Sequence, residues 1–170
     1  MSSTILHPLS SSPEPLKIVL DTTFTSSDNI FLYHKTINRK IYDDARRRTH
    51  LDLIPSSSSK DDIFDVLLYN ERNEITECSI SNIAVEFFDN NKSFWKTPEI
   101  GCAGLLSGVM RSYLIEIGDV TPGVITIEEL KTAQQAGRKI KCFNSVRKEY
   151  QVVLVDQIMP QIVRAPHINT

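Results

Sequence analysis

Three separated segments of this chain carry groups that could act on one ligand. Lys35 lies in residues 31–39, which read FLYHKTINR, and its amine can form a Schiff base with an aldehyde if its surroundings keep part of it deprotonated. Glu77 supplies a carboxylate, and residues 104–111, which read GLLSGVMR, predict a helix start whose free N–H groups favour a phosphate. In this order, these are the groups needed to hold pyridoxal phosphate by its aldehyde, ring nitrogen and phosphate.

These segments recur in the same order in a known family of enzymes. Residues 76–83 read TECSISNI and residues 95–98 read WKTP, between the lysine segment and the helix start. On these four segments the chain resembles the fold-type IV pyridoxal-phosphate enzymes, the class IV aminotransferase family, over residues 17–157. The HKTxNR form of the lysine segment is similar to the aminodeoxychorismate lyase branch. The resemblance implies pyridoxal 5'-phosphate as the cofactor and a homodimer.

The resemblance implies roles for the amine and the carboxylate. Lys35 would form the Schiff base with the cofactor and is the predicted catalytic residue, although a surface lysine is the ordinary alternative. Glu77 would keep the pyridine nitrogen protonated so that the ring acts as an electron sink; otherwise it is a strand-end glutamate facing water. Asn82 lies in the same family register and is also predicted to bind the cofactor.

A second set of residues is predicted to bind the phosphate. The backbone amides of Val109 and Met110 would bind it at the helix start, where the helix dipole favours a dianion. Ser145, in residues 143–147 (FNSVR), would add its hydroxyl or its amide from another loop, or else it is an ordinary turn residue. The phosphate site is therefore expected to join two loops that are distant in sequence.

Composition and charge argue against nucleic-acid and membrane partners. The chain has 170 residues, 41% of them hydrophobic, and 19 basic against 21 acidic side chains give a formal charge of -2. No apolar stretch approaches the roughly 20 residues that a bilayer-spanning helix needs. The run 46–48, three arginines, is expected to be a solvated helix face. Arg39 and Arg147 are candidates for binding a carboxylate, and each is equally well explained as an ion-pair partner.

Cysteine usage and the N-terminus indicate a reducing, cytoplasmic compartment. Cys78, Cys102 and Cys142 are odd in number and share no CxxC or Cys/His spacing, so neither a disulfide framework nor a metal site is predicted. The first 16 residues lack a basic start followed by an apolar core, so a secretory signal is not expected.

The hydrophobic pattern predicts an α+β protein with a disordered leader (1–16), a cofactor-binding domain (17–157) and a polar tail (158–170). Strands between residues 63 and 97 are expected to form an antiparallel meander within a curved, mostly antiparallel sheet with packed helices, like the large domain of the resembled family. The expected strands are 17–22, 63–68, 74–77, 83–88, 93–97, 124–127, 140–143 and 152–155, and the expected helices are 38–49, 103–117 and 127–135.

The function that the resemblance implies is a lyase acting on a small molecule. It would convert 4-amino-4-deoxychorismate to 4-aminobenzoate and pyruvate, on the route to folate. One alternative is a branched-chain or D-amino acid aminotransferase, which shares the first steps and differs only after a proton has been removed. Another is an inactive truncated homologue, because family members carry a smaller N-terminal domain before the lysine segment and here 34 residues precede Lys35.

Overall fold

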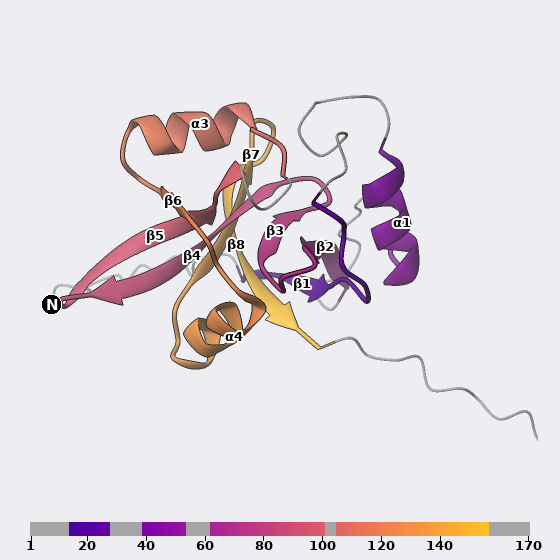
Figure 1. Ribbon diagram of the computed structural model, residues 1–170, viewed down its shortest axis with the longest axis horizontal. Coiled ribbons are helices and arrows are strands. Elements are labelled where there is room, and N and C mark those ends of the chain that lie inside the picture. Colours follow the sequence, from indigo (N-terminus) through magenta and orange to yellow (C-terminus); the bar gives the residue numbers. More distant parts are fainter. Residues whose placement is uncertain (1–13, 28–38, 54–61, 101–104, 157–170) are drawn as a thin grey trace, which may run out of the picture.

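The computed structural model describes residues 14–27, 39–53, 62–100 and 105–156, so Lys35 and Cys102 lie outside the described residues. Within these ranges one eight-stranded sheet is packed against three helices (Figure 1). None of the helices described there has the length and apolarity needed to cross a membrane. The elements are β1 (Leu16–Leu20), α1 (Lys40–Arg48), β2 (Ile63–Tyr69), β3 (Ile75–Cys78), β4 (Asn82–Asp89), β5 (Lys92–Pro98), α3 (Val109–Glu116), β6 (Thr121–Gly123), α4 (Ile127–Gln135), β7 (Ile140–Asn144) and β8 (Lys148–Val155).

The sheet has the strand order β3-β2-β1-β8-β7-β4-β5-β6. Four of its seven pairings are antiparallel, and β1/β2, β1/β8 and β5/β6 are parallel. The α+β class with a mostly antiparallel sheet is therefore confirmed. The single meander expected over residues 63–97 is wrong, because β1, β8 and β7 stand between β2 and β4. Apolar patterns identify strands, but the preference for pairing sequential strands holds only about two-thirds of the time.

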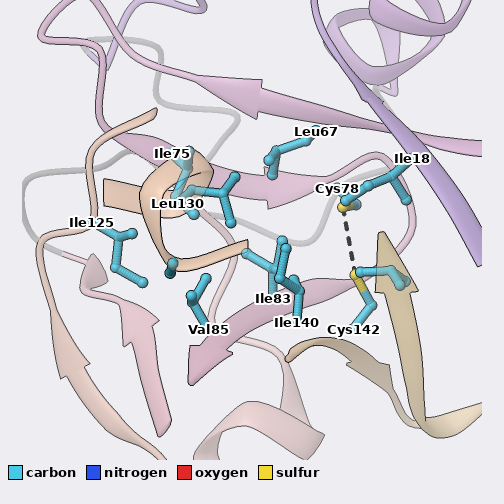
Figure 2. Close-up of a cluster of buried hydrophobic side chains, with 12 residues drawn as sticks. Ile18, Leu67, Ile75, Cys78, Ile83, Val85, Ile125, Leu130, Ile140 and Cys142 are labelled. Atoms are coloured by element: carbon cyan, nitrogen blue, oxygen red, sulfur yellow. Dashed lines mark hydrogen bonds between the residues drawn. The ribbon is translucent and has the colours of Figure 1, made fainter. Parts of the chain in front are cut away.

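The largest hydrophobic core lies between α4 and one face of the sheet (Figure 2). Leu130 of α4 packs there with Ile83 and Val85 of β4. Cys78 and Cys142 are buried in the same core as free thiols, with their Sγ atoms 3.6 Å apart. α4 begins with a capping box, because the Thr126 hydroxyl accepts the Glu129 N–H while the Glu129 carboxylate accepts the Thr126 N–H.

The other face of the sheet is covered by α1 and α3. Successive residues of a strand point to opposite faces. Thus Ala84, between two residues that face α4, packs with Leu114 of α3, and Val66 packs with Ala45 of α1. The two helices cover different ends of this face (Figure 1).

The start of α3 and the strand expected over residues 124–127 differ from expectation. α3 begins at Val109 rather than near residue 103, and residues 105–108 are not helical, because the Leu106 N–H and C=O bond to the side chains of Glu77 and Asn82. The strand expected over 124–127 is also wrong: residues 121–123 form β6 beside β5. In the following segment Thr126 forms one isolated β-bridge with Glu74, which precedes β3, and is also the N-cap of α4.

The arginine run of α1 is not uniformly solvated. Arg47 is exposed, as expected, but Arg46 is only 1% exposed. Its Nη1 donates to Asp65 Oδ1 at 2.8 Å and to the Ser79 hydroxyl at 3.0 Å. A buried carboxylate requires such a partner, because an unpaired buried charge is costly. Arg46 therefore joins α1 to the turn between β3 and β4.

Candidate functional site

A pocket of about 440 Å³ lies on the face of the sheet that carries α1 and α3. Its walls come from four segments: residues 39 and 42, residues 77–82, residues 106–110 and residues 144–147. All five predicted site residues that the structure describes line this pocket; they are Glu77, Asn82, Val109, Met110 and Ser145. The sixth, Lys35, lies outside the described residues. The fold thus brings together segments that the sequence separates widely.

Glu77 is a buried carboxylate held by three donors. It lies in β3 and is 5% exposed. Its Oε1 accepts the Tyr42 hydroxyl at 2.7 Å and the Leu106 N–H at 3.0 Å, and its Oε2 accepts the Asn82 Nδ2 at 3.1 Å. Because each carboxylate oxygen can accept two hydrogen bonds, Oε2 retains the capacity for one more donor. The side chain is positioned by protein groups and does not face bulk water.

Burial changes the protonation of this carboxyl group. Loss of hydration raises the pKa of Glu77 to about 7, against the lowering effects of the Tyr42 and Leu106 hydrogen bonds and of Arg111 and Arg39. Burial and the neighbouring carboxylate also raise the pKa of Tyr42 well above its usual value, so its hydroxyl stays a donor. A cationic N–H next to Glu77 would favour its ionised form.

The raised pKa predicts a stability that falls as pH rises. An unfolded glutamate has a pKa near 4.5, and that of folded Glu77 is about 7. Between these values the folded state holds a proton that the unfolded state lacks. The stabilising contribution is complete below pH 4.5 and is lost as pH rises through 7, by about 3 kcal/mol in all. Urea unfolding from pH 5 to pH 8 should show this component in the wild type and not in Glu77→Gln; identical pH profiles of the two proteins would contradict it.

The predicted phosphate-binding groups lie at the start of α3 and in the β7–β8 turn. Gly108 is the N-cap of α3 and no side chain caps the helix among the described residues. The first N–H groups of a helix have no partner within it, so those of Val109 and Met110 are suited to an anion. The turn that carries Ser145 is shaped by Asn144, whose Oδ1 accepts the N–H groups of Val146 and Arg147 at 3.0 and 2.7 Å.

Asn82 stands between the carboxylate and the start of α3. Its Nδ2 donates to Glu77 Oε2 and to the Leu106 carbonyl oxygen, both at 3.1 Å. Its Oδ1 lies against Gly108, where an added Cβ would come within 2.4 Å. Both amide hydrogens of Asn82 are therefore used by protein acceptors.

Sequence reasoning missed Tyr42 as part of the site. It lies within the helix expected over residues 38–49, for which no role in the site was predicted. A buried tyrosine hydroxyl, however, usually needs a hydrogen-bond partner, and that requirement was the available signal. Arg39 and Arg147 both line the pocket. Arg39 donates to the Ser79 carbonyl oxygen at 2.9 Å, and the Arg147 guanidinium lies 4.8 Å from the centre of the Phe64 ring.

The fold is that of the fold-type IV enzymes, and comparison with known proteins identifies the family. A family model described as amino-transferase class IV matches residues 2–152. A Schizosaccharomyces pombe protein named "Putative aminodeoxychorismate lyase" is 34% identical over 147 residues, which are 84% of this chain and 57% of that protein. The chain belongs to the class IV aminotransferase family. It spans little more than half the length of this curated relative.

Solved structures show the same fold. A "Putative amino-acid aminotransferase" from Mesorhizobium loti is 31% identical with a TM-score of 0.68, over 84% of this chain and 61% of that one. A hypothetical aminotransferase from Mycobacterium tuberculosis, solved in its PLP-bound form, is 18% identical with a TM-score of 0.61, over 89% of this chain and 50% of that one. At that identity the second likeness shows the fold alone.

Proposed function

We propose that this chain holds pyridoxal 5'-phosphate in the pocket between α1 and α3. The observation that carries the proposal is the pairing, in one pocket, of a buried carboxylate that can accept one more donor with a helix start that no side chain caps among the described residues. A ring N–H would satisfy Glu77 and a phosphate would satisfy the free N–H groups of α3. Residues 17–157 would then form the cofactor-binding domain.

Each residue has a role in this proposal. Lys35 provides the amine that holds the cofactor aldehyde and then moves the proton of the substrate carbon bearing the amino group. When bound, the cofactor supplies an electron-accepting ring that stabilises negative charge on that carbon. Glu77 keeps a proton on the ring nitrogen, and Tyr42 holds the Glu77 carboxylate in place. Val109, Met110 and Ser145 bind the phosphate.

We propose that the reaction is the conversion of 4-amino-4-deoxychorismate to 4-aminobenzoate and pyruvate. The 34% identity to the S. pombe protein and the HKTxNR form of the lysine segment support this choice. The runner-up is an aminotransferase for branched-chain or D-amino acids, and the likeness to the M. loti protein, which is named as an amino-acid aminotransferase, supports it.

We also propose that the protein is a cytoplasmic homodimer. The other alternative is a chain without activity of its own, because this chain spans only 57% of the S. pombe protein.

Cofactor attachment tests the proposed function directly. The purified 170-residue chain should acquire visible absorption when pyridoxal phosphate is added. Borohydride reduction should then fix the cofactor to the peptide that contains residues 34–39. The absence of absorption, or label found only on other lysines, would overturn the proposal.

A substrate assay separates the two reactions. Release of pyruvate and 4-aminobenzoate from 4-amino-4-deoxychorismate would identify the lyase. Conversion of the bound cofactor to its pyridoxamine form on addition of an amino acid would identify the aminotransferase instead.

A further inference from the structure

The carboxylate of Glu77 and the segment before α3 are joined by a closed set of hydrogen bonds. The Leu106 N–H donates to Glu77 Oε1 at 3.0 Å. Asn82 Nδ2 bridges Glu77 Oε2 and the Leu106 carbonyl oxygen, and the Gly108 N–H donates to that same carbonyl oxygen at 2.9 Å. The position of the helix start is thereby tied to the position of the carboxylate, and Asn82 is the side chain that contacts both.

Glycine is needed at position 108 because there is no room for a Cβ atom, and not because the backbone conformation there requires glycine. Its φ of -70° and ψ of 143° are extended values that any residue adopts. An added Cβ, however, would lie 2.4 Å from Asn82 Oδ1, and this oxygen belongs to a buried side chain whose amide is already held at two acceptors. Asn82 cannot move away without losing those bonds. The contact therefore requires glycine at 108 as long as asparagine stands at 82.

We propose that Asn82 is a positioning residue that sets the separation between Glu77 and the start of α3, with Gly108 as its required partner. The inference rests on the proposed function, in which Glu77 binds the ring nitrogen and α3 binds the phosphate of the same rigid cofactor. A ligand of fixed length gains from two subsites only if their spacing matches it. Asn82 acts on the cofactor through Glu77 and Leu106, which differs from the direct cofactor contact that its sequence register predicted.

Comparison of two ligands separates positioning from simple stabilisation. Pyridoxal reaches the ring subsite only, whereas pyridoxal phosphate reaches both. The affinity for pyridoxal phosphate divided by the affinity for pyridoxal therefore measures how well the two subsites are spaced. A variant that merely unfolds part of the protein weakens both ligands equally and leaves the ratio unchanged. Loss of correct spacing lowers the ratio.

The first experiment measures this ratio by equilibrium titration in the wild type, Asn82→Ala and Asn70→Ala. Asn70 is a matched control: it is also a buried asparagine, and its side chain bonds to Glu74 and Arg72 in the β2–β3 turn, outside the pocket. Asn82→Ala should lower the ratio by about tenfold, the size of a lost hydrogen bond to a charged group. Asn70→Ala should keep the wild-type ratio. An unchanged ratio in Asn82→Ala would overturn the positioning role.

The second experiment tests the contact between the two residues without any cofactor. Gly108→Ala should lower the urea midpoint of unfolding in the wild type. In the Asn82→Ala background the opposing oxygen is gone, so the same change should cost little, and the two effects should not add. Equal costs in both backgrounds would overturn the claim that Asn82 requires glycine at 108.

The outcomes distinguish this inference from the proposed function. A wild-type chain that binds no pyridoxal phosphate would overturn the proposed function and, with it, the positioning role. A wild type that binds the cofactor, together with Asn82→Ala that weakens both ligands equally, would keep the proposed function and remove only the role of Asn82.

Discussion

Replacing Lys35 with alanine should abolish borohydride-stable attachment of the cofactor. It should also lower turnover by about 10² to 10⁴-fold. This is the usual contribution of a positioned group that moves a proton. Lys35 would perform two tasks, holding the aldehyde and moving the substrate proton, and alanine performs neither. Noncovalent binding should persist, because Glu77 and the start of α3 are unchanged. Mass spectrometry after reduction and a turnover assay with the identified substrate measure the two losses separately.

Lys40 provides the matched control for this prediction. It is the next lysine along the chain, opens α1, and has an exposed side chain that pairs with Asp44 on the same helix. Lys40→Ala should retain both the reduced adduct and the turnover. Retention of the adduct in Lys35→Ala, on any other lysine, would show that the amine lies elsewhere.

Glu77→Gln should still bind the cofactor but lose turnover by about 10² to 10³-fold, the usual cost of removing one preorganised electrostatic group. A neutral amide cannot hold a proton on the ring nitrogen, so the ring accepts electrons less well. The amide also has one acceptor oxygen where the carboxylate has two, and the NH₂ group would face the Asn82 Nδ2, a second donor. Titration with cofactor and measurement of kcat distinguish binding from turnover.

Glu86→Gln is the control for a change of charge alone. Glu86 lies on β4, accepts the Lys139 N–H at 3.1 Å and is not among the pocket residues. Its variant should match the wild type in turnover. Near-normal turnover in Glu77→Gln would place the carboxylate that serves the ring nitrogen at another residue.

Much of the pocket was predictable because its residues occur in short segments of fixed order. Glu77 and Val109 could be named from these segments, and the structure places both in one pocket. Tyr42 could not, because its role depends on a hydrogen bond between α1 and β3, a contact between elements that the linear pattern does not contain. Arg46 was misjudged for the same reason: its burial is set by Asp65, which lies on another element.

The order of the strands was the least predictable part of the fold. Strand-forming segments separated by turn-forming residues located β2 through β5 within a few residues, because both signals are local. Pairing is a property of the whole sheet. The start of α3 was misplaced because Leu106 gives its backbone groups to Glu77 and Asn82, a competition that helix propensity does not register.

The parallel pairing of β1 with β8 has a consequence for the rate at which this protein folds. It joins Leu16 to Val152 and is the link between the strands β3-β2-β1 and the strands β8-β7-β4-β5-β6. Such a contact between distant parts of the chain forms slowly, because the intervening loop must first be closed. Tyr42 of α1, which packs on β1 and β2, and Glu77 of β3 lie with the first group, whereas Ser145 in the β7–β8 turn lies with the second. The pocket draws residues from both groups, so a cofactor added during refolding should find its complete site only after β1 and β8 have paired.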